Sequence, residues 1–201
     1  YKGIYYISPI IYILSKIINK KFIIRIFAGN FDQSFEKSNW LKKIIIKKTI
    51  FKSDVIFVET KFLLNFLKNK GCSNVSLLHN ARSKPSKKYK IKKKFNNKFV
   101  FISHVKITKG IIQILEASKK IKHNYCIDVY GPFKDRKITE KDFTDSSVKY
   151  KGVLNPDDVV EKLLTYDVLI LPTFHNGEGY PGVILEAFSV GMPIISTKWR
   201  S

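Results

Sequence analysis

The sequence predicts an α/β protein in which mostly parallel sheets carry helices on both faces. Strand-like and helix-like segments alternate along the chain, as expected for successive βαβ units. The predicted strand DVLILPT at residues 167–173 is uninterruptedly apolar over 168–172, which is typical of a strand buried on both faces of a parallel sheet. With 44% hydrophobic residues, the 201-residue chain can bury a sizeable core, and its length allows one or two domains.

The first part of the chain contains three predicted strands and two predicted helices. The strands are compact runs of β-branched and apolar residues at 21–27, 54–60 and 75–80. The helices have apolar residues at helical intervals and cover 39–53 and 61–71. Gly71 is well placed to end the second helix, because glycine readily adopts the left-handed conformation that terminates helices.

The segment 82–98 (RSKPSKKYKIKKKFNNK) differs from the rest of the chain. It contains eight lysines, one arginine and no acid, and it includes Pro85. Such a segment cannot bury apolar surface and is expected to be an exposed connection. We therefore predict one domain over 1–81, a lysine-rich linker over 82–98 and a second domain over 99–201.

The second domain repeats the alternation. Predicted strands occupy 99–105, 125–131, 148–154 and 167–173, of which the short 148–154 reads as an edge strand. Predicted helices occupy 110–121 and 156–166, and the second of these begins with a proline and two aspartates, a favourable helix start. A further helix is expected to begin near Pro181 and to end at Gly191, before the strand PIIST.

The charge balance leaves several partners open. Lys+Arg number 37 against 16 Asp+Glu, a net charge of +21. A basic surface attracts nucleic acid or anionic lipid headgroups. The alternative is a general bias of the composition toward lysine, which would place lysines at solvent-exposed positions without any partner. The apolar stretch GIYYISPIIYILSKII at 3–18 is too short to span a membrane and predicts a packed or interfacial helix. Two distant cysteines and the lack of a secretory signal fit a cytosolic protein.

The stretch HNGEGYPGVILEAFSVG at 175–191 places two glutamates, Glu178 and Glu186, around the start of a predicted helix. In open α/β sheets, ligands bind at the carboxyl ends of strands, where helix N-termini offer unpaired amides to phosphates. Glu186, about one and a half turns into the helix, suits the paired hydroxyls of a ribose. Taken alone, Gly179 and Gly182 also fit plain turn residues, and Glu178 fits a helix-cap partner.

These residues carry a family resemblance. EGYPGVILE resembles the Glu-x7-Glu signature of retaining glycosyltransferases of family 4, which have the GT-B fold of two Rossmann-like domains. The segments FVFISHVKITKGIIQILEA, IDVYGP, VKYKGVL and YDVLILPT resemble, in order, the donor domain of this family. Upstream, IIRIFAGNFD, SDVIFVET and VSLLHNAR resemble the latter part of its acceptor-side domain. Nearly the whole chain is covered, with both ends of the family pattern missing, so we expect an incomplete and inactive enzyme.

The resemblance implies roles for particular residues. Glu186 would hold the ribose of a nucleotide diphosphate sugar, and Glu178 would contact the transferred sugar. The backbone of the motif would hold the diphosphate, through Gly179, Tyr180, Pro181, Gly182 and Val183. Lys109 matches a lysine that neutralises the leaving diphosphate. His104 stands where the family usually has an arginine: a protonated His104, a substitute Lys106 and a neutral structural histidine are the alternatives.

No metal or cofactor is implied. An Asp-x-Asp motif is absent from the strand ends, and the histidines show no metal-ligand spacing, so we expect a metal-independent enzyme. His175 is a candidate for lining the cleft. Gly29 and Asn30 occupy the place of an acceptor-side glycine loop, for which a plain turn is the alternative. The expected partners are the nucleotide sugar, a glycan or lipid-linked acceptor and an anionic membrane surface, whereas nucleic acid is disfavoured.

The sequence therefore predicts a retaining glycosyltransferase of bacterial cell-surface polysaccharide synthesis, cytoplasmic or peripheral on the inner membrane face. One alternative is a glycoside hydrolase that uses the two glutamates, which would require carboxyl groups about 5 Å apart for retention or about 6.5–9.5 Å apart for inversion. A second alternative is a basic binding module that retains a nucleotide-binding fold without catalysis. Its signature would be a steep salt dependence and no response to nucleotide.

Overall fold

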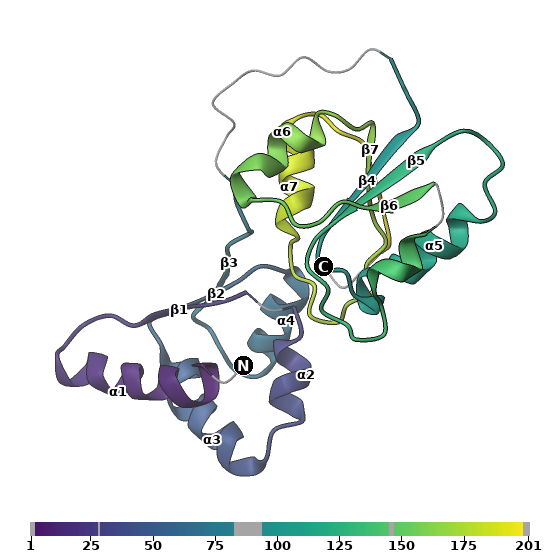
Figure 1. The fold of residues 1–201 in the computed structure, drawn as a ribbon. Coiled ribbons are helices and arrows are strands. Elements are labelled where there is room, and N and C mark those ends of the chain that lie inside the picture. Colours follow the sequence, from purple (N-terminus) through teal and green to yellow (C-terminus); the bar gives the residue numbers. More distant parts are fainter. Residues whose placement is uncertain (1–2, 28, 83–93, 145–146, 199–201) are drawn as a thin grey trace. The chain divides into compact units, whose positions relative to one another are not determined.

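In the computed structural model, residues 3–27, 29–82, 94–144 and 147–198 are described (Figure 1). The chain divides into two compact units. Unit 1 comprises Tyr1–Asn80 together with Asn176–Tyr180, and unit 2 comprises Ala81–His175 and the segment that begins at Pro181. Most of the predicted linker 82–98 lies outside the described residues.

Unit 1 contains a three-stranded parallel sheet in the order β1-β2-β3, and the three strands are β1 (Ile23–Ile26), β2 (Val55–Val58) and β3 (Val75–Leu77). Its helical segments, in chain order, are η1 (Gly3–Ile7), α1 (Ser8–Ile17), α2 (Phe31–Glu36), α3 (Trp40–Lys48), η2 (Ile50–Lys52) and α4 (Lys61–Asn69). One apolar core joins the strands and helices, with Ile26, Phe31, Ile46 and Ile56 almost fully buried. The prediction of parallel strands is confirmed for this unit.

Two predicted elements of unit 1 end earlier than expected. The predicted helix 39–53 splits into α3 and η2 at Thr49, whose hydroxyl donates to the Ile45 carbonyl at 2.7 Å, and the backbone leaves α-helical geometry there. The predicted strand 75–80 pairs only as far as Leu77, and the Leu78 amide makes the last bond to β2. His79 and Asn80 therefore follow the carboxyl end of the strand and are available for other contacts.

Unit 2 contains a five-stranded parallel sheet in the order β6-β5-β4-β7-β8. The strands are β4 (Lys98–Ile102), β5 (Cys126–Tyr130), β6 (Val148–Tyr150), β7 (Val168–Leu171) and β8 (Ile194–Ser196). The helical segments are η3 (Ile107–Lys109), α5 (Ile111–Ser118), η4 (Glu140–Phe143), η5 (Pro156–Asp158), α6 (Val159–Leu163) and α7 (Gly182–Ser189). The predicted edge strand is confirmed, because β6 ends the order.

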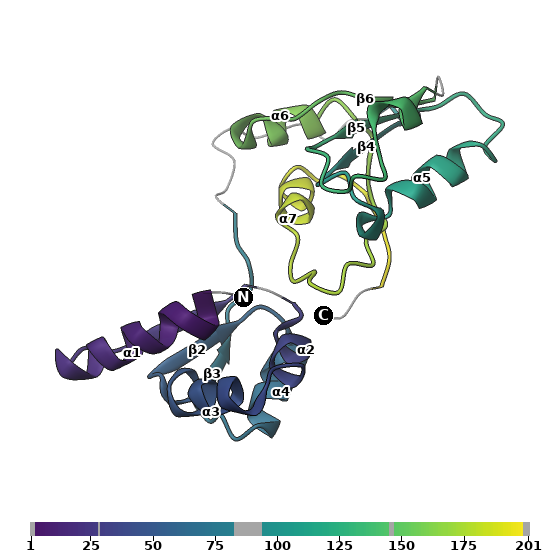
Figure 2. The ribbon, with the colours of Figure 1, turned by 60° about the horizontal axis from the view of Figure 1, so that its bottom comes forward.

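Helices lie on both faces of the sheet in unit 2, with α5 on one face and α6 and α7 on the other (Figures 1 and 2). This placement follows from the strand order. The crossover from β4 to β5 and the crossover from β7 to β8 run in opposite directions from the centre of the sheet. Because both connections are right-handed, their helices lie on opposite faces. The strand order therefore diverges between β4 and β7, which is where ligands bind in open α/β sheets.

Candidate functional site

Helix α7 begins directly after the loop that follows β7. Its first residue is Gly182, and Pro181 is the N-cap residue. The preference of proline for the first helical position predicts a start at Pro181, so the helix begins one residue later than predicted. Pro181 makes no side-chain capping bond, and the first turn holds no acidic residue. Because the amides of a first helical turn have no partner within the helix, and the helix dipole favours negative charge there, this end suits an anion.

Glu186 lies four residues after Gly182, on the same side of α7, because side chains at this spacing are neighbours on a helix. Its side chain is only 17% exposed and accepts a hydrogen bond from the Nε of Arg82 at 2.8 Å. The guanidinium of Arg82 also lies against Gly182, where a Cβ atom would overlap it. The predicted site residue Glu186 is thus paired with an arginine that sequence reasoning assigned to the linker.

Lys109 belongs to η3, which packs against the segment after β7. The Phe174 amide donates to the Thr108 carbonyl at 2.9 Å, and the Thr108 hydroxyl lies 3.2 Å from Nδ1 of His175. Gly110, the N-cap residue that precedes α5, has φ +84°, and a Cβ atom there would overlap the Pro172 carbonyl. These contacts bring the Lys109 loop to the carboxyl end of β7, and the role of Lys109 at the diphosphate stays a prediction.

His104 lies in the short segment between β4 and η3 and is exposed. The flanking residues are held at the end of β5: the Ser103 amide donates to the Tyr130 carbonyl, and the Val105 amide donates to the Pro132 carbonyl. His104 is therefore on a fixed backbone at the same edge of the sheet as Lys109, because both follow carboxyl ends of parallel strands.

The residues just before α7 pack within unit 1. The Gly29 amide donates to the Gly177 carbonyl at 3.3 Å, and a Cβ atom at Gly29 would overlap the Glu178 carbonyl. Glu178 itself is buried, with 8% of its surface exposed. Gly29 is thus a position where two backbone segments approach closely. Asn30 is the N-cap residue of α2, and its carbonyl accepts from Ser34; an acceptor role for Gly29 and Asn30 stays a prediction.

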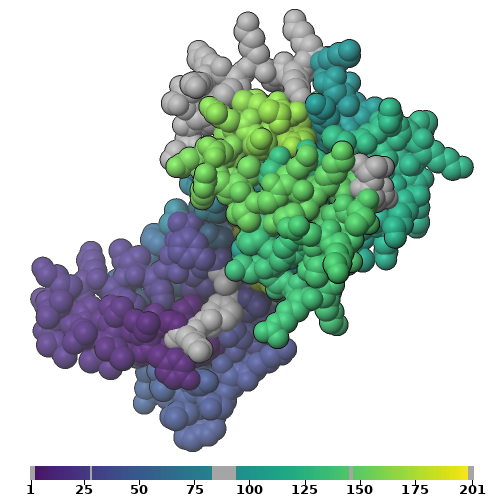
Figure 3. All heavy atoms as spheres, in the orientation of Figure 1, coloured from purple at the N-terminus to yellow at the C-terminus, as the bar shows by residue number. Residues whose placement is uncertain are grey.

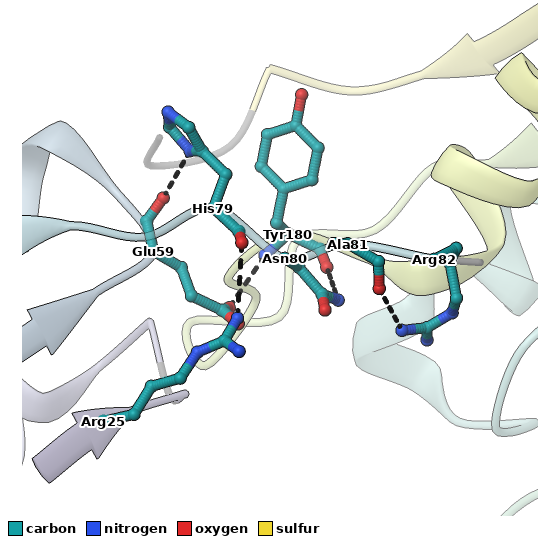
Figure 4. A network of polar contacts seen from close by, with 7 residues as sticks. All are labelled: Arg25, Glu59, His79, Asn80, Ala81, Arg82 and Tyr180. Atoms are coloured by element: carbon teal, nitrogen blue, oxygen red, sulfur yellow. Dashed lines mark hydrogen bonds and ion pairs between the residues drawn. The ribbon is translucent and has the colours of Figure 1, made fainter. Parts of the chain in front are cut away.

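A polar network in unit 1 contacts the backbone of Gly179 and Tyr180 (Figure 4). The Glu59 carboxylate, at the end of β2, is 5% exposed and pairs with Arg25 of β1 at 3.2 Å. Its other oxygen lies 3.4 Å from the Tyr180 amide and 2.5 Å from the place of a Cβ atom on Gly179. The Asn80 side-chain amide donates to the Tyr180 carbonyl at 2.9 Å. Glu59 and Asn80 thus bond both polar groups of the Tyr180 backbone.

The same network orients His79. Its Nδ1 donates to the Glu59 carbonyl at 3.0 Å, and its ring lies 5.8 Å, between centroids, from the ring of Tyr180. Arg25 donates a second bond to the His79 carbonyl at 3.4 Å. Each residue of the network therefore bonds to at least one other, which fixes the segment before α7 on unit 1.

The predicted site residues thus fall in two groups. The residues Glu178, Gly179, Tyr180, Gly29 and Asn30 pack in unit 1, and the residues Pro181, Gly182, Val183, Glu186, Lys109 and His104 pack in unit 2.

Sequence reasoning missed four polar residues, namely Arg25, Glu59, Asn80 and Arg82. Two of them carried a signal: a charge inside the apolar run IIRI and an acid at the end of IFVE are costly to bury unless they are paired. Asn80 and Arg82 carried none, because they adjoin a lysine-rich segment in which one more polar residue is unremarkable.

Within the described ranges, no three His, Cys, Asp or Glu side chains gather as metal ligands. The expected metal independence stays a prediction. No helix of the described residues is both long and apolar enough to cross a membrane.

Comparison with known proteins identifies the class. The family model described as Glycosyl transferases group 1 matches residues 82–201, more than half of the chain. The chain belongs to this family. Each of its two units contains a parallel sheet, as expected for the α/β domains of the GT-B fold. No match was found among curated proteins.

Solved structures share the fold. A mutant of S. aureus TarM, in complex with fondaparinux, alpha-GlcNAc-glycerol and UDP, has a TM-score of 0.68 and 18% identity, with 94% of this chain and 40% of TarM covered. Anabaena HepE in complex with UDP-glucose has a TM-score of 0.73 and 14% identity, with 93% and 56% covered. The lipopolysaccharide outer core galactosyltransferase WaaB has a TM-score of 0.65 and 19% identity, with 97% and 55% covered. The chain spans about half the length of these proteins.

Proposed function

We propose that this chain forms part of a retaining glycosyltransferase that transfers a hexose from a nucleotide diphosphate sugar to a glycan or lipid-linked acceptor. Membership of the glycosyl transferases group 1 family supports the reaction class. TarM and HepE, with the same fold, were solved with UDP or UDP-glucose, which supports a nucleotide sugar as the donor. Retention of configuration rests on the resemblance of the paired-glutamate motif.

The observation that carries the proposal is the start of α7. An N-terminus without a side-chain cap follows an interior strand of the sheet, and Glu186 lies one turn further on the same side. The first-turn amides suit the diphosphate of the donor, since they present positive partial charge to an anion. Glu186 suits the hydroxyl groups of the ribose, since a carboxylate accepts hydrogen bonds and offers no donor.

The remaining roles concern the reaction itself. Departure of the nucleoside diphosphate places negative charge on the leaving oxygen, and Lys109 together with the α7 N-terminus would stabilise that charge. Neutralisation by fixed protein groups agrees with a reaction that needs no metal. Glu178 would lie against the transferred sugar, and its backbone is held by Gly29 while the adjacent residues are held by Glu59.

We further propose that the enzyme acts on the inner face of a bacterial membrane in the synthesis of surface polysaccharide. Helix α1 exposes five apolar side chains, namely Ile10, Ile11, Ile13, Leu14 and Ile17. Its atoms, in purple, are exposed on the face of unit 1 shown in Figure 3. Lys16, Lys20 and Lys21 accompany them, and the chain carries +21. Apolar side chains with flanking cations suit an anionic bilayer surface.

Vesicle sedimentation tests the membrane proposal. Vesicles with anionic lipid should retain the protein, whereas Ile10→Asp/Leu14→Asp should reduce the retained fraction and neutral vesicles should retain little. Equal retention of wild type and variant would contradict it.

The donor site is tested by replacing Glu186. Titration with UDP, ADP and GDP, and with the corresponding glucose conjugates, identifies the preferred ligand. Glu186→Gln should weaken that ligand at least tenfold, because the hydrogen bonds from the ribose to a charged acceptor are lost. Glu116→Gln, on the exposed side of α5, removes the same charge and should leave binding unchanged. Unaltered affinity in Glu186→Gln would refute the site.

A further inference from the structure

Arg82 occupies a position that helix electrostatics alone does not favour. Its guanidinium lies against Gly182, the first residue of α7, and bonds to Glu186 one turn later. The N-terminal end of a helix carries positive partial charge and repels a cation. The ion pair with Glu186 offsets this repulsion, but Arg82 is 43% exposed, and ion pairs with such exposure contribute little to stability.

The glycine at the start of α7 makes this position accessible. A Cβ atom at Gly182 would overlap both the terminal nitrogen and the central carbon of the guanidinium. The side chain can therefore lie directly over the first helical turn only because residue 182 is glycine. Arg82 also donates to the Ala81 carbonyl at 3.2 Å, so that its planar group is held at two sides, by the backbone of Ala81 and by Glu186.

The charges here favour an additional anion. The helix end and the guanidinium are both positive, whereas Glu186 supplies one negative charge. A diphosphate brings more negative charge and accepts bidentate bonds from arginine, which a single lysine such as Lys109 does not provide. Arg82 already provides a guanidinium at this place, because it lies against Gly182 at the start of α7.

We propose that Arg82 binds the diphosphate of the donor, and that Glu186 holds Arg82 in the ligand-free protein. When the donor binds, the ribose hydroxyls replace Arg82 on Glu186, and the guanidinium moves to the phosphate oxygens beside the α7 amides. Arg82 then exchanges the carboxylate for phosphate oxygens, and Glu186 exchanges the guanidinium for hydroxyl donors, so both groups remain hydrogen-bonded. This inference rests on the proposed function of α7 as the donor site.

The test separates the phosphate contribution from the ribose contribution. With the preferred nucleoside diphosphate as the probe, dissociation constants are measured for the diphosphate and for the free nucleoside. Arg82→Gln should weaken the diphosphate at least tenfold and leave the nucleoside unchanged, and Arg82→Lys should fall between Gln and wild type. Glu186→Gln should weaken both ligands. Lys119→Gln removes one charge at the C-terminal end of α5, the opposite edge of the sheet, and should change neither constant.

Each outcome decides the matter. If Arg82→Gln folds and binds the diphosphate as tightly as wild type, or more tightly, Arg82 is only the counter-ion of Glu186 and the inference is wrong while the donor site stands. If wild type binds none of the diphosphates, or if Glu186→Gln has no effect, the proposed function fails and the inference fails with it. Thermal unfolding of each variant shows whether a loss of affinity reflects a loss of folded protein.

Discussion

Glu59 and Arg25 form an ion pair at 3.2 Å in which the carboxylate is almost completely buried. The two residues lie at the ends of neighbouring parallel strands, and the second carboxylate oxygen faces the Tyr180 amide. Burying a carboxylate is costly unless it is paired and hydrogen-bonded, and Glu59 has both kinds of partner. The pair therefore links the sheet of unit 1 to the residues that precede α7.

Replacing Glu59 should destabilise unit 1. Glu59→Gln leaves Arg25 without its buried partner, and we expect a loss of about 1–3 kcal/mol, below the value for a fully buried pair because Arg25 is 28% exposed. Urea unfolding measures the change. Glu36→Gln removes an exposed carboxylate paired with lysines, and it should have a smaller effect. Equal effects of the two substitutions would show that burial of the pair is unimportant.

Gly110 should tolerate alanine poorly because an added Cβ atom would have no room, and Gly152 serves as the matched control. Gly110 and Gly152 both have φ +84°, so alanine is strained to a similar degree at each. Only at Gly110 would the added Cβ atom overlap the Pro172 carbonyl, whereas it meets nothing at Gly152. Gly110→Ala should therefore lower the melting temperature clearly more than Gly152→Ala. If both variants melt together, the close packing of the Lys109 loop on the end of β7 is not real.

Acid should weaken unit 1 through Asp54. Its carboxylate accepts a bond from the Phe22 amide at 2.7 Å, and this bond, with help from Lys16 at 3.7 Å, lowers the pKa of Asp54 below its ordinary value. A carboxylate whose pKa is lower in the folded state contributes stability above its unfolded pKa and loses it as the pH falls through the folded pKa.

Urea midpoints between about pH 6 and pH 2 test this expectation. The midpoint of wild type should fall with acidification, and Asp54→Asn should flatten part of that fall while lowering stability at neutral pH. A variant whose pH profile runs parallel to that of wild type would contradict the role of Asp54.

Cys72 should react only when unit 1 unfolds. The thiol is 3% exposed, and burial raises its pKa to about 11, so that almost no thiolate forms near neutral pH. A thiol reagent at pH 7.5 should label Cys72 in the Cys126→Ser protein only in denaturant. Rapid labelling of the native protein would show that the core around Cys72 opens readily.

Much of the fold could be predicted from the sequence because parallel strands are buried on both faces. The run 167–173 contains β7, and its apolar residues at 168–172 are typical of a strand buried on both faces. Element ends were less predictable. Nothing local to Thr49 indicates that its hydroxyl will compete with the backbone, and Leu78, although apolar, follows the last paired residue of β3.

The polar contacts could be predicted only in part. Glu186 stood out because a carboxylate in an apolar helix needs a partner, but its partner Arg82 lies 104 residues away in sequence. Arg25 and Glu59 are 34 residues apart and meet because β1 and β2 are neighbours in register. The pairing of Arg25 with Glu59 depends on the order of the strands in the sheet, and this order cannot be predicted from the spacing of the two residues in the sequence.

The most direct test of the account is a crystal structure of the protein with the nucleoside diphosphate sugar that it binds most tightly. We expect the diphosphate at the first turn of α7, the ribose hydroxyls on Glu186 and the guanidinium of Arg82 on a phosphate oxygen. A diphosphate bound away from α7, with Glu186 still paired to Arg82, would contradict the central claim.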